Sequence, residues 1–80
     1  MKREEILAEL AALMHERGTL STDSNLKETD RFSDDLSFDS LDMVELGMDV
    51  ETKFNIKIPE TDLADIKTVG QVIDKVASKS

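Results

Sequence analysis

The stretch DDLSFDSLDMVELGMDVE, residues 34–51, decides the fold of this 80-residue chain. It predicts a helix from Ser40 to about Lys53, because three apolar residues recur every four positions and form one line that can be buried. That line consists of Leu46, Val50 and Phe54. The same stretch holds seven acidic residues and neither Lys nor Arg, within a chain whose net charge is −8. Charge concentrated in this way favours encounter with basic partner surfaces.

The N-terminal part of the chain predicts a second helix. Residues 3–17 form an amphipathic pattern that ends at Gly18, a plausible helix stop. Its apolar stripe contains Ile6, Leu10, Leu13 and Met14, with Leu7 beside it. Between Thr19 and Asp39 the pattern breaks, and a structureless loop of about twenty residues is uncommon in a compact domain. We therefore expect an ordered crossover with room for one short helical turn, held to the core by Leu20, Leu26, Phe32 and Leu36.

The C-terminal part predicts one short helix and one long helix. Ile56 and Ile58 alternate with polar residues over a span too short for a strand, and a proline then starts a short helical turn over about 59–64. Thr68 and Gln71 form a capping box at the start of the last helix. The apolar face of that helix holds Val69, Val72, Ile73 and Val76. The sequence thus predicts one all-α domain over residues 1–80, a small four-helix bundle with three long helices, one short helix and a long first loop.

Composition excludes several classes of protein. Without cysteine, the chain can form neither a disulfide framework nor a thiolate metal site. A net charge of −8 argues against binding to nucleic acid or to an anionic membrane, since both would repel the protein. No apolar run approaches transmembrane length, and Glu4, Glu5 and Glu9 interrupt any signal-peptide core. We therefore expect a soluble, cytoplasmic protein that acts as a monomer.

Ser40, at the start of the predicted central helix, is the candidate functional residue. Its side chain could cap the helix, a role worth about 1 kcal/mol, or Asp39 could be the cap and leave Ser40 as the first helical residue. Two features favour more than capping. Glu45 and Asp49 form a like-charge pair at i,i+4 that no local base relieves. Three apolar residues also lie among the acids, namely Leu41, Val44 and Met48. A docking face for basic partners requires such apolar contacts.

Neither catalysis nor metal binding fits the residues around Ser40. The serine is not in a G-x-S-x-G elbow, and His15, the only histidine, lies in the first predicted helix, away from the acids. A hydroxyl without a base beside it is a poor nucleophile. Residues 23–27 faintly resemble the start of an EF-hand loop, but Lys27 occupies a ligand position and Glu28 replaces the required glycine. We expect no catalytic residue and no metal site, and interpret Ser40 as a group that another enzyme modifies.

The chain holds two motifs and a helix start whose spacing matches that of a known family. They are DLxxDSLDxVEL from Asp35 to Leu46, FxIxIP from Phe54 to Pro59, and the helix start at Thr68-Val69. In this combination the chain closely resembles the acyl carrier protein family over about residues 3–77. The resemblance implies a four-helix fold and a serine that bears 4′-phosphopantetheine through a phosphodiester. It also implies a holo-synthase, a phosphopantetheinyl transferase that installs this arm from coenzyme A. Substrates then travel as thioesters on the terminal thiol of the arm, and the carrier itself is not an enzyme.

The resemblance also assigns roles to residues. Ser40 matches the attachment site, flanked by Asp39 and Leu41, and Ile66 aligns with a residue that lies near the arm and the acyl-chain entrance in relatives. The implied recognition helix presents Leu41, Asp42, Val44, Glu45, Met48, Asp49 and Glu51.

The chain departs from the family pattern in three places, one of which is the stretch Thr19–Asp30, which does not closely match the commonest fatty-acid carriers. Ser37 and Phe38 stand where relatives usually have Gly and a small residue, and a bulky Phe38 could alter how the arm lies. Gly47 costs the recognition helix about 1 kcal/mol relative to Ala. It is consistent with close packing, with an enlarged acyl cavity or with neutral drift.

The leading hypothesis is an acyl carrier for fatty-acid biosynthesis or for a specialised lipid or polyketide-type pathway. Its partners would be the holo-synthase and the acyl-loading, condensing and other pathway enzymes, each with a basic docking surface. One alternative is an aminoacyl, peptidyl or D-alanyl carrier, which would share the serine and the bundle. An alternative of another class is an acidic helical interaction module without a prosthetic group, in which Ser40 is only a cap.

Overall fold

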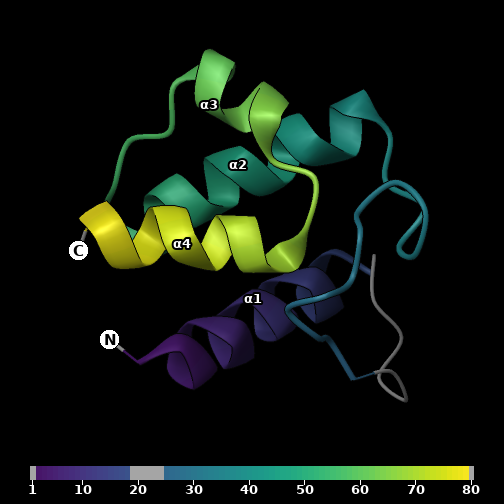
Figure 1. Ribbon diagram of the computed structural model, residues 1–80, viewed down its shortest axis with the longest axis horizontal. Coiled ribbons are helices and arrows are strands. Elements are labelled where there is room, and N and C mark those ends of the chain that lie inside the picture. Colours follow the sequence, from purple (N-terminus) through teal and green to yellow (C-terminus); the bar gives the residue numbers. More distant parts are fainter. Residues whose placement is uncertain (1, 19–24, 80) are drawn as a thin grey trace.

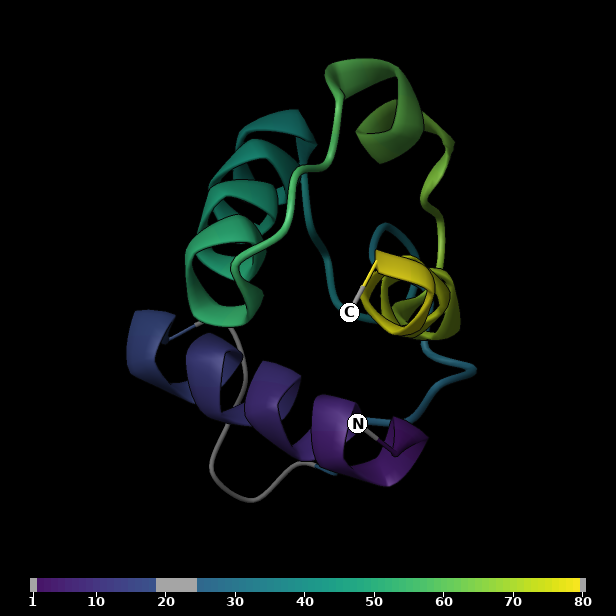
Figure 2. The ribbon, with the colours of Figure 1, turned by 90° about the vertical axis from the view of Figure 1, so that its left-hand side faces the viewer.

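The computed structural model describes residues 2–18 and 25–79, and within them the chain forms four helices and no strand. The helices are α1 (Arg3–Arg17), α2 (Ser40–Phe54), α3 (Glu60–Asp65) and α4 (Val69–Lys79). Figures 1 and 2 show α1, α2 and α4 around a shared interior, with the short α3 placed between the ends of α2 and α4. The predicted all-α bundle of three long helices and one short helix is confirmed. None of these four helices is long and apolar enough to cross a lipid bilayer.

The core is aliphatic and draws on every part of the described chain. The predicted stripes of α1 and α4 are buried, except that Leu7 and Leu13 are half-buried at the edge of the core. In α2 the predicted line holds at Leu46 and Val50, whereas Phe54 is half-buried. The buried apolar residues are Ile6, Leu10, Met14, Leu26, Phe32, Phe38, Leu46, Val50, Ile56, Ile58, Ile66, Val69, Val72, Ile73 and Val76.

The helix ends follow the local sequence signals. Gly18 ends α1 in the left-handed conformation with φ of 74°, which glycine adopts without steric cost. The short helix begins one residue later than expected, because Pro59 is the residue that precedes it. At α4, the Gln71 N–H donates to Thr68 Oγ1 at 3.3 Å and the Thr68 N–H donates to Gln71 Oε1 at 2.9 Å. These reciprocal bonds confirm the predicted capping box.

The described part of the crossover, residues 25–39, is ordered by hydrogen bonds to the start of α4. The Phe32 N–H donates to the Lys67 carbonyl at 3.0 Å, and the Val69 N–H donates to the Asp30 carbonyl at 3.0 Å. Leu26 and Phe32 are buried and Leu36 is half-buried, as predicted. A hydrogen-bonded turn over 31–36 takes the place of the expected helical turn. The anchor predicted at residue 20 lies outside the described residues.

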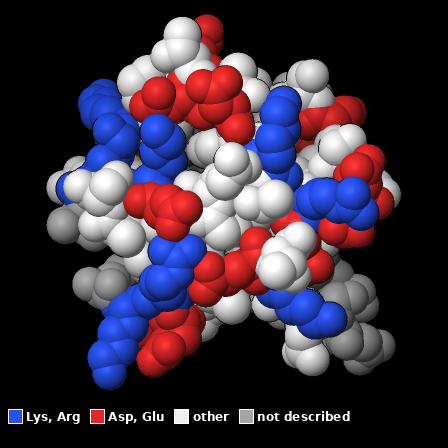
Figure 3. Space-filling model, in the orientation of Figure 1, with Lys and Arg blue, Asp and Glu red and all other residues white. Residues whose placement is uncertain are grey.

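Charged side chains tie the elements together at the surface. Arg3 of α1 contacts Glu28 of the crossover and Asp74 of α4. Lys53 of α2 pairs with Glu9 of α1 at 2.9 Å. Figure 3 shows acidic and basic atoms interleaved around a central uncharged patch on the face that carries α4. Exposed pairs of this kind each contribute little to stability, so burial of the core holds the bundle together.

Two non-glycine residues have left-handed backbones, Ser37 with φ of 58° and Asn55 with φ of 54°. That conformation costs most residues about 1–2 kcal/mol, and asparagine tolerates it better than serine. Glycine avoids this strain at an entropic cost of about 0.5–1 kcal/mol. We therefore expect Ser37→Gly to raise the free energy of unfolding by about 0.5–1 kcal/mol, measured by urea denaturation.

Asn55→Gly is the matched control for this prediction, because the backbone angle is nearly the same. Its gain should be smaller, with an unchanged denaturant slope in both variants. A Ser37→Gly variant that is less stable than the wild type, or that gains no more than Asn55→Gly, would show that Ser37 is unstrained.

Candidate functional site

Ser40 is the first residue of α2 and is exposed to solvent. Asp39 precedes it as the N-cap and forms a capping box with Asp42. The Asp42 N–H donates to Asp39 Oδ1 at 2.9 Å, and the Asp39 N–H donates to Asp42 Oδ2 at 3.1 Å. No group in the described residues hydrogen-bonds to the Ser40 hydroxyl. Of the two capping possibilities, the structure therefore selects Asp39 and leaves the serine hydroxyl available.

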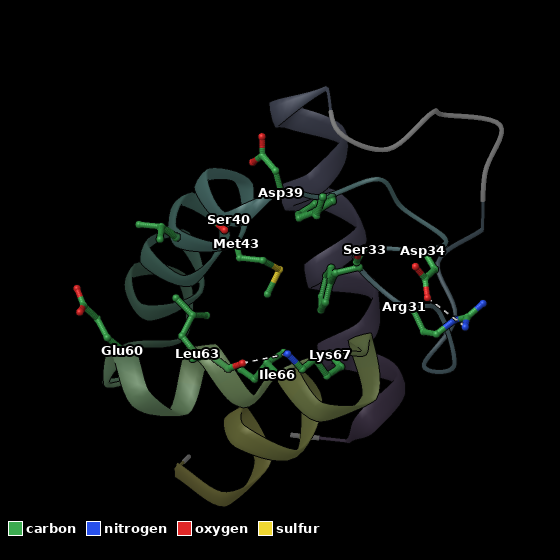
Figure 4. Close-up of a pocket in the computed structure, with 14 residues that line it drawn as sticks. Arg31, Ser33, Asp34, Asp39, Ser40, Met43, Glu60, Leu63, Ile66 and Lys67 are labelled. Carbon is green, nitrogen blue, oxygen red and sulfur yellow. Dashed lines mark hydrogen bonds and ion pairs between the residues drawn. The ribbon is translucent and has the colours of Figure 1, made fainter.

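A groove of about 1130 Å³ opens beside Ser40, between α2, α3 and the crossover. Figure 4 shows Met43 of α2 and Leu63 of α3 pointing into this groove. Its apolar lining includes Phe32, Phe38, Met43, Val44, Leu63, Ala64 and Ile66. Ile66, which the resemblance associates with the acyl-chain entrance, is thus brought to the same groove as Ser40. Arg31 and Lys67 also line the groove.

Of the two bulk changes relative to the family pattern, Phe38 lines this groove, and Gly47 lies against Leu63, which lines it. Phe38 is buried and its ring lies 5.2 Å from that of Phe32, centroid to centroid, so it forms part of the groove wall. Gly47 is buried in α2, and a Cβ there would lie 3.1 Å from both Cδ atoms of Leu63. Of the roles considered for Gly47, close packing is the one that the geometry supports, since Leu63 sits directly over the missing side chain.

The exposed side of α2 carries an apolar strip. Leu41, Val44 and Met48 have 64%, 46% and 61% of their surface exposed. This exposure agrees with the prediction that these residues lie at the surface among the acids. Large apolar residues left in water on one helix are a feature of surfaces that bind other molecules.

The sequence offers no local base to relieve Glu45 and Asp49, but the fold brings a distant one to them. Arg17, at the end of α1, reaches both: its Nη1 donates to Glu45 Oε2 at 2.7 Å, and its Nε and Nη2 grip the two oxygens of Asp49. Local sequence could not reveal this base, because it does not show that α1 ends beside the middle of α2. The Arg17 guanidinium lowers the pKa of Asp49, and these carboxylates in turn raise the pKa of Arg17.

The remaining acids of residues 34–51 are also engaged. Arg31 pairs with Asp34 and Asp35, each at 3.2 Å, and lowers the pKa of Asp35. Glu51, expected to belong to the recognition helix, accepts a hydrogen bond from the Ile58 N–H at 2.8 Å and so ties the end of α2 to the segment before α3. With the capping box counted, every acidic residue of the stretch has a partner.

Two further candidates from the sequence were a catalytic histidine and a metal site. His15 is exposed on α1. In the described ranges, 2–18 and 25–79, no three His, Asp or Glu side chains converge on a point where they could hold a metal ion. Residues 23 and 24 of the EF-hand-like run lie outside those ranges.

The pKa of Asp49 predicts how stability depends on pH. Because Arg17 lowers this pKa in the folded protein, the ionised carboxylate stabilises the fold above the unfolded-state value of about 3.9. That contribution disappears as the pH falls below about 4, through the folded-state pKa. We expect Asp49→Asn to lower the free energy of unfolding at neutral pH by about 0.5–1 kcal/mol. Urea unfolding from neutral to acidic pH should then show a shallower loss of stability than in the wild type.

Asp65→Asn is the control for this measurement, since Asp65 is exposed and has no ion pair among the described residues. Its stability should fall with acid as the wild type does. Identical pH profiles for Asp49→Asn and the wild type would mean that Arg17 does not hold Asp49 in solution.

Comparisons with known proteins agree with this architecture. A family model described as a phosphopantetheine attachment site matches residues 4–76. The acyl carrier protein of Acidothermus cellulolyticus is 38% identical over 78 residues, which cover 98% of this chain and 92% of that protein. The meromycolate extension acyl carrier protein of Mycolicibacterium smegmatis is 42% identical over 71 residues, or 89% of this chain and 71% of that protein. The crystal structure of the Thermotoga maritima acyl carrier protein matches with a TM-score of 0.87 at 28% identity, over 99% of this chain and 91% of that one.

These matches extend over nearly the whole chain, and sequence and fold point to the same family. Its members carry 4′-phosphopantetheine covalently, work with phosphopantetheinyl transferases and pathway enzymes, and are carriers without catalytic activity of their own. The chain belongs to the acyl carrier protein family.

Proposed function

We propose that this chain is an acyl carrier that bears its 4′-phosphopantetheine arm on Ser40. The observation that carries the proposal is the state of Ser40, which is exposed and unengaged at the start of α2 because Asp39 provides the cap. A transferase needs a hydroxyl that it can reach and that the fold does not use. Ser40 meets both conditions.

The surroundings of Ser40 fit a phosphodiester-linked arm. The N–H groups of Ser40 and Leu41 open a 15-residue helix, where unpaired donors and the positive end of the dipole favour a phosphate. When bound, the arm supplies the thiol that this cysteine-free chain lacks, and that thiol holds acyl groups as thioesters. Met43, Leu63 and Ile66 offer an apolar surface against which the arm and an aliphatic cargo can pack.

We assign partner docking to the exposed side of α2. Its apolar strip would supply the contacts that exclude water, and the surrounding acids would steer basic partner surfaces toward it. The strip is Leu41, Val44 and Met48, and the acids are Asp42, Glu45 and Asp49. Glu51 is better assigned to holding the Ile58 N–H than to recognition. Ile66 serves the groove rather than the outer face of α2.

For the pathway, we propose fatty-acid biosynthesis or a specialised lipid or polyketide-type pathway. The apolar lining of the groove favours acyl cargo over aminoacyl cargo. One relative, the Mycolicibacterium smegmatis protein, is named for meromycolate extension, which is a lipid process. We further propose that the chain works in the cytoplasm as a monomer, as one carrier domain over residues 1–80.

Intact-mass measurement tests the attachment site. After incubation with coenzyme A, Mg²⁺ and a broad-specificity phosphopantetheinyl transferase, the wild type should gain the mass of one phosphopantetheinyl group. Ser40→Ala should gain none, while its helical circular dichroism stays that of the wild type. Equal modification of both proteins would move the site elsewhere. A folded wild type that gains no mass would favour the interaction module, in which Ser40 has no prosthetic group.

Loading assays test the cargo. The modified protein should accept fatty-acyl and malonyl groups from their coenzyme A donors and transferases, because the groove is largely apolar. Aminoacyl donors with their activating enzymes should load it far less. Efficient aminoacylation together with poor acylation would reverse the assignment and identify an aminoacyl or peptidyl carrier.

A further inference from the structure

We propose that Arg17 is an intramolecular competitor for the partners of α2. Its guanidinium holds Glu45 and Asp49, two carboxylates that a basic partner would otherwise engage, and so slows the docking of such partners. This inference rests on the proposed docking face. It adds a regulatory residue on α1, outside the helix to which recognition is assigned.

The contacts of Arg17 are those that a partner's arginine would make. Nε and Nη2 face the two oxygens of Asp49, with Nη2 3.0 Å from Oδ1, while Nη1 lies 2.7 Å from Glu45 Oε2. A guanidinium on paired carboxylate oxygens is the geometry that arginine favours in recognition. The two acids therefore already bind the chemical group proposed for the partner, and the chain itself supplies it.

The ion pairs of Arg17 are exposed to solvent, so a partner's guanidinium can reach the two acids and replace that of Arg17. The side chains of Arg17, Glu45 and Asp49 are 35%, 40% and 28% exposed. We call the contacts of Arg17 with Glu45 and Asp49 the Arg17 clasp. A small cavity of about 130 Å³ lies beside it, lined by Arg17, Phe38, Asp42, Glu45 and Leu46. The Arg17 side chain thus has space on one side and water on the other, and can leave the acids without disturbing buried groups.

The helix that carries Arg17 stays in place when the clasp opens. Ile6, Leu10 and Met14 bury α1 in the core, and Lys53 ties the same two helices through Glu9 at 2.9 Å. Gly18 follows Arg17 directly and ends the helix. Release of the acids therefore requires rotation of one side chain and no movement of α1.

The Arg17 clasp can be tested by the rate at which a phosphopantetheinyl transferase modifies Ser40. At low ionic strength, Arg17→Gln should raise kcat/KM about two- to fivefold, the factor that corresponds to one exposed ion pair. Arg17→Lys should give a smaller rise, because lysine keeps the charge without the two-pronged grip. The plot of log kcat/KM against log salt should be steeper for Arg17→Gln than for the wild type, since two more acids are then free to be screened.

Lys53→Gln is the matched control. It makes the same change in net charge and removes an ion pair between the same helices, but it leaves Glu45 and Asp49 held by Arg17. Its rate should rise less than that of Arg17→Gln. Circular dichroism and urea midpoints verify that each variant is folded, and if Arg17→Gln is not, the comparison of Arg17→Lys with the wild type decides.

The possible failures are distinguishable. A wild type that is never modified at Ser40 would remove the proposed function and the competitor with it. If the wild type is modified normally but Arg17→Gln is modified no faster than Lys53→Gln, only the proposed role of Arg17 as a competitor is wrong. A lower rate for Arg17→Gln would mean that Arg17 positions the acids for the partner instead of withholding them.

Discussion

Reciprocal hydrogen bonds between Asp39 and Asp42 fix where α2 begins, and the rest of the site depends on that start. Successive residues of an α-helix are about 100° apart around its axis. In the helix that this capping box starts, Leu46 and Val50 face the core, whereas Leu41, Val44 and Met48 face solvent. The same capping box leaves Ser40 at the first helical position with its hydroxyl unused. One local interaction thus sets the start of α2 and leaves the hydroxyl of the candidate attachment site available.

Features of the fold that depend on neighbouring residues could be predicted from the sequence, and those that depend on packing could not. Helix positions and most of the buried stripes followed from periodicity, and the capping box at Thr68 followed from residue type and spacing. The grip of Arg17 on residues of α2 joins positions 28 and 32 apart in the sequence. Only the arrangement of α1 against α2 brings them together. Leu63 over Gly47 is likewise a product of how α3 packs on α2. The left-handed backbone at Ser37 is a conformation that glycine would adopt without steric cost.

The acidic stretch has a different electrostatic character from the one that its composition suggests. Arg17 and Arg31, both outside the stretch, engage four of its seven acids, and the other three serve backbone N–H groups. A basic partner would therefore exchange one ion pair for another at Glu45 and Asp49, which limits its net gain. Weak net gain suits a protein that must release each partner after delivery, since affinity is mostly adjusted through the dissociation rate. Steering at longer range still follows from the net charge of −8.

Phe38 and Gly47 affect the groove in different ways, Phe38 as a lining residue and Gly47 through its contact with Leu63. Phe38 adds a ring, tilted by 49° against that of Phe32, to the wall formed by the crossover. Gly47 leaves α2 without a side chain at this point. Leu63 of α3 packs so close to it that a Cβ would lie 3.1 Å from both Leu63 Cδ atoms. Leu63 also lines the groove, so the distance between α2 and α3 and the shape of the groove are set by the same contact. Because Met43 enters the groove from the same helix as Gly47, the width of the groove is determined where α2 meets α3, within about two turns of Ser40. In the proposed carrier, the first half of α2 would therefore couple selection of cargo to presentation of the arm.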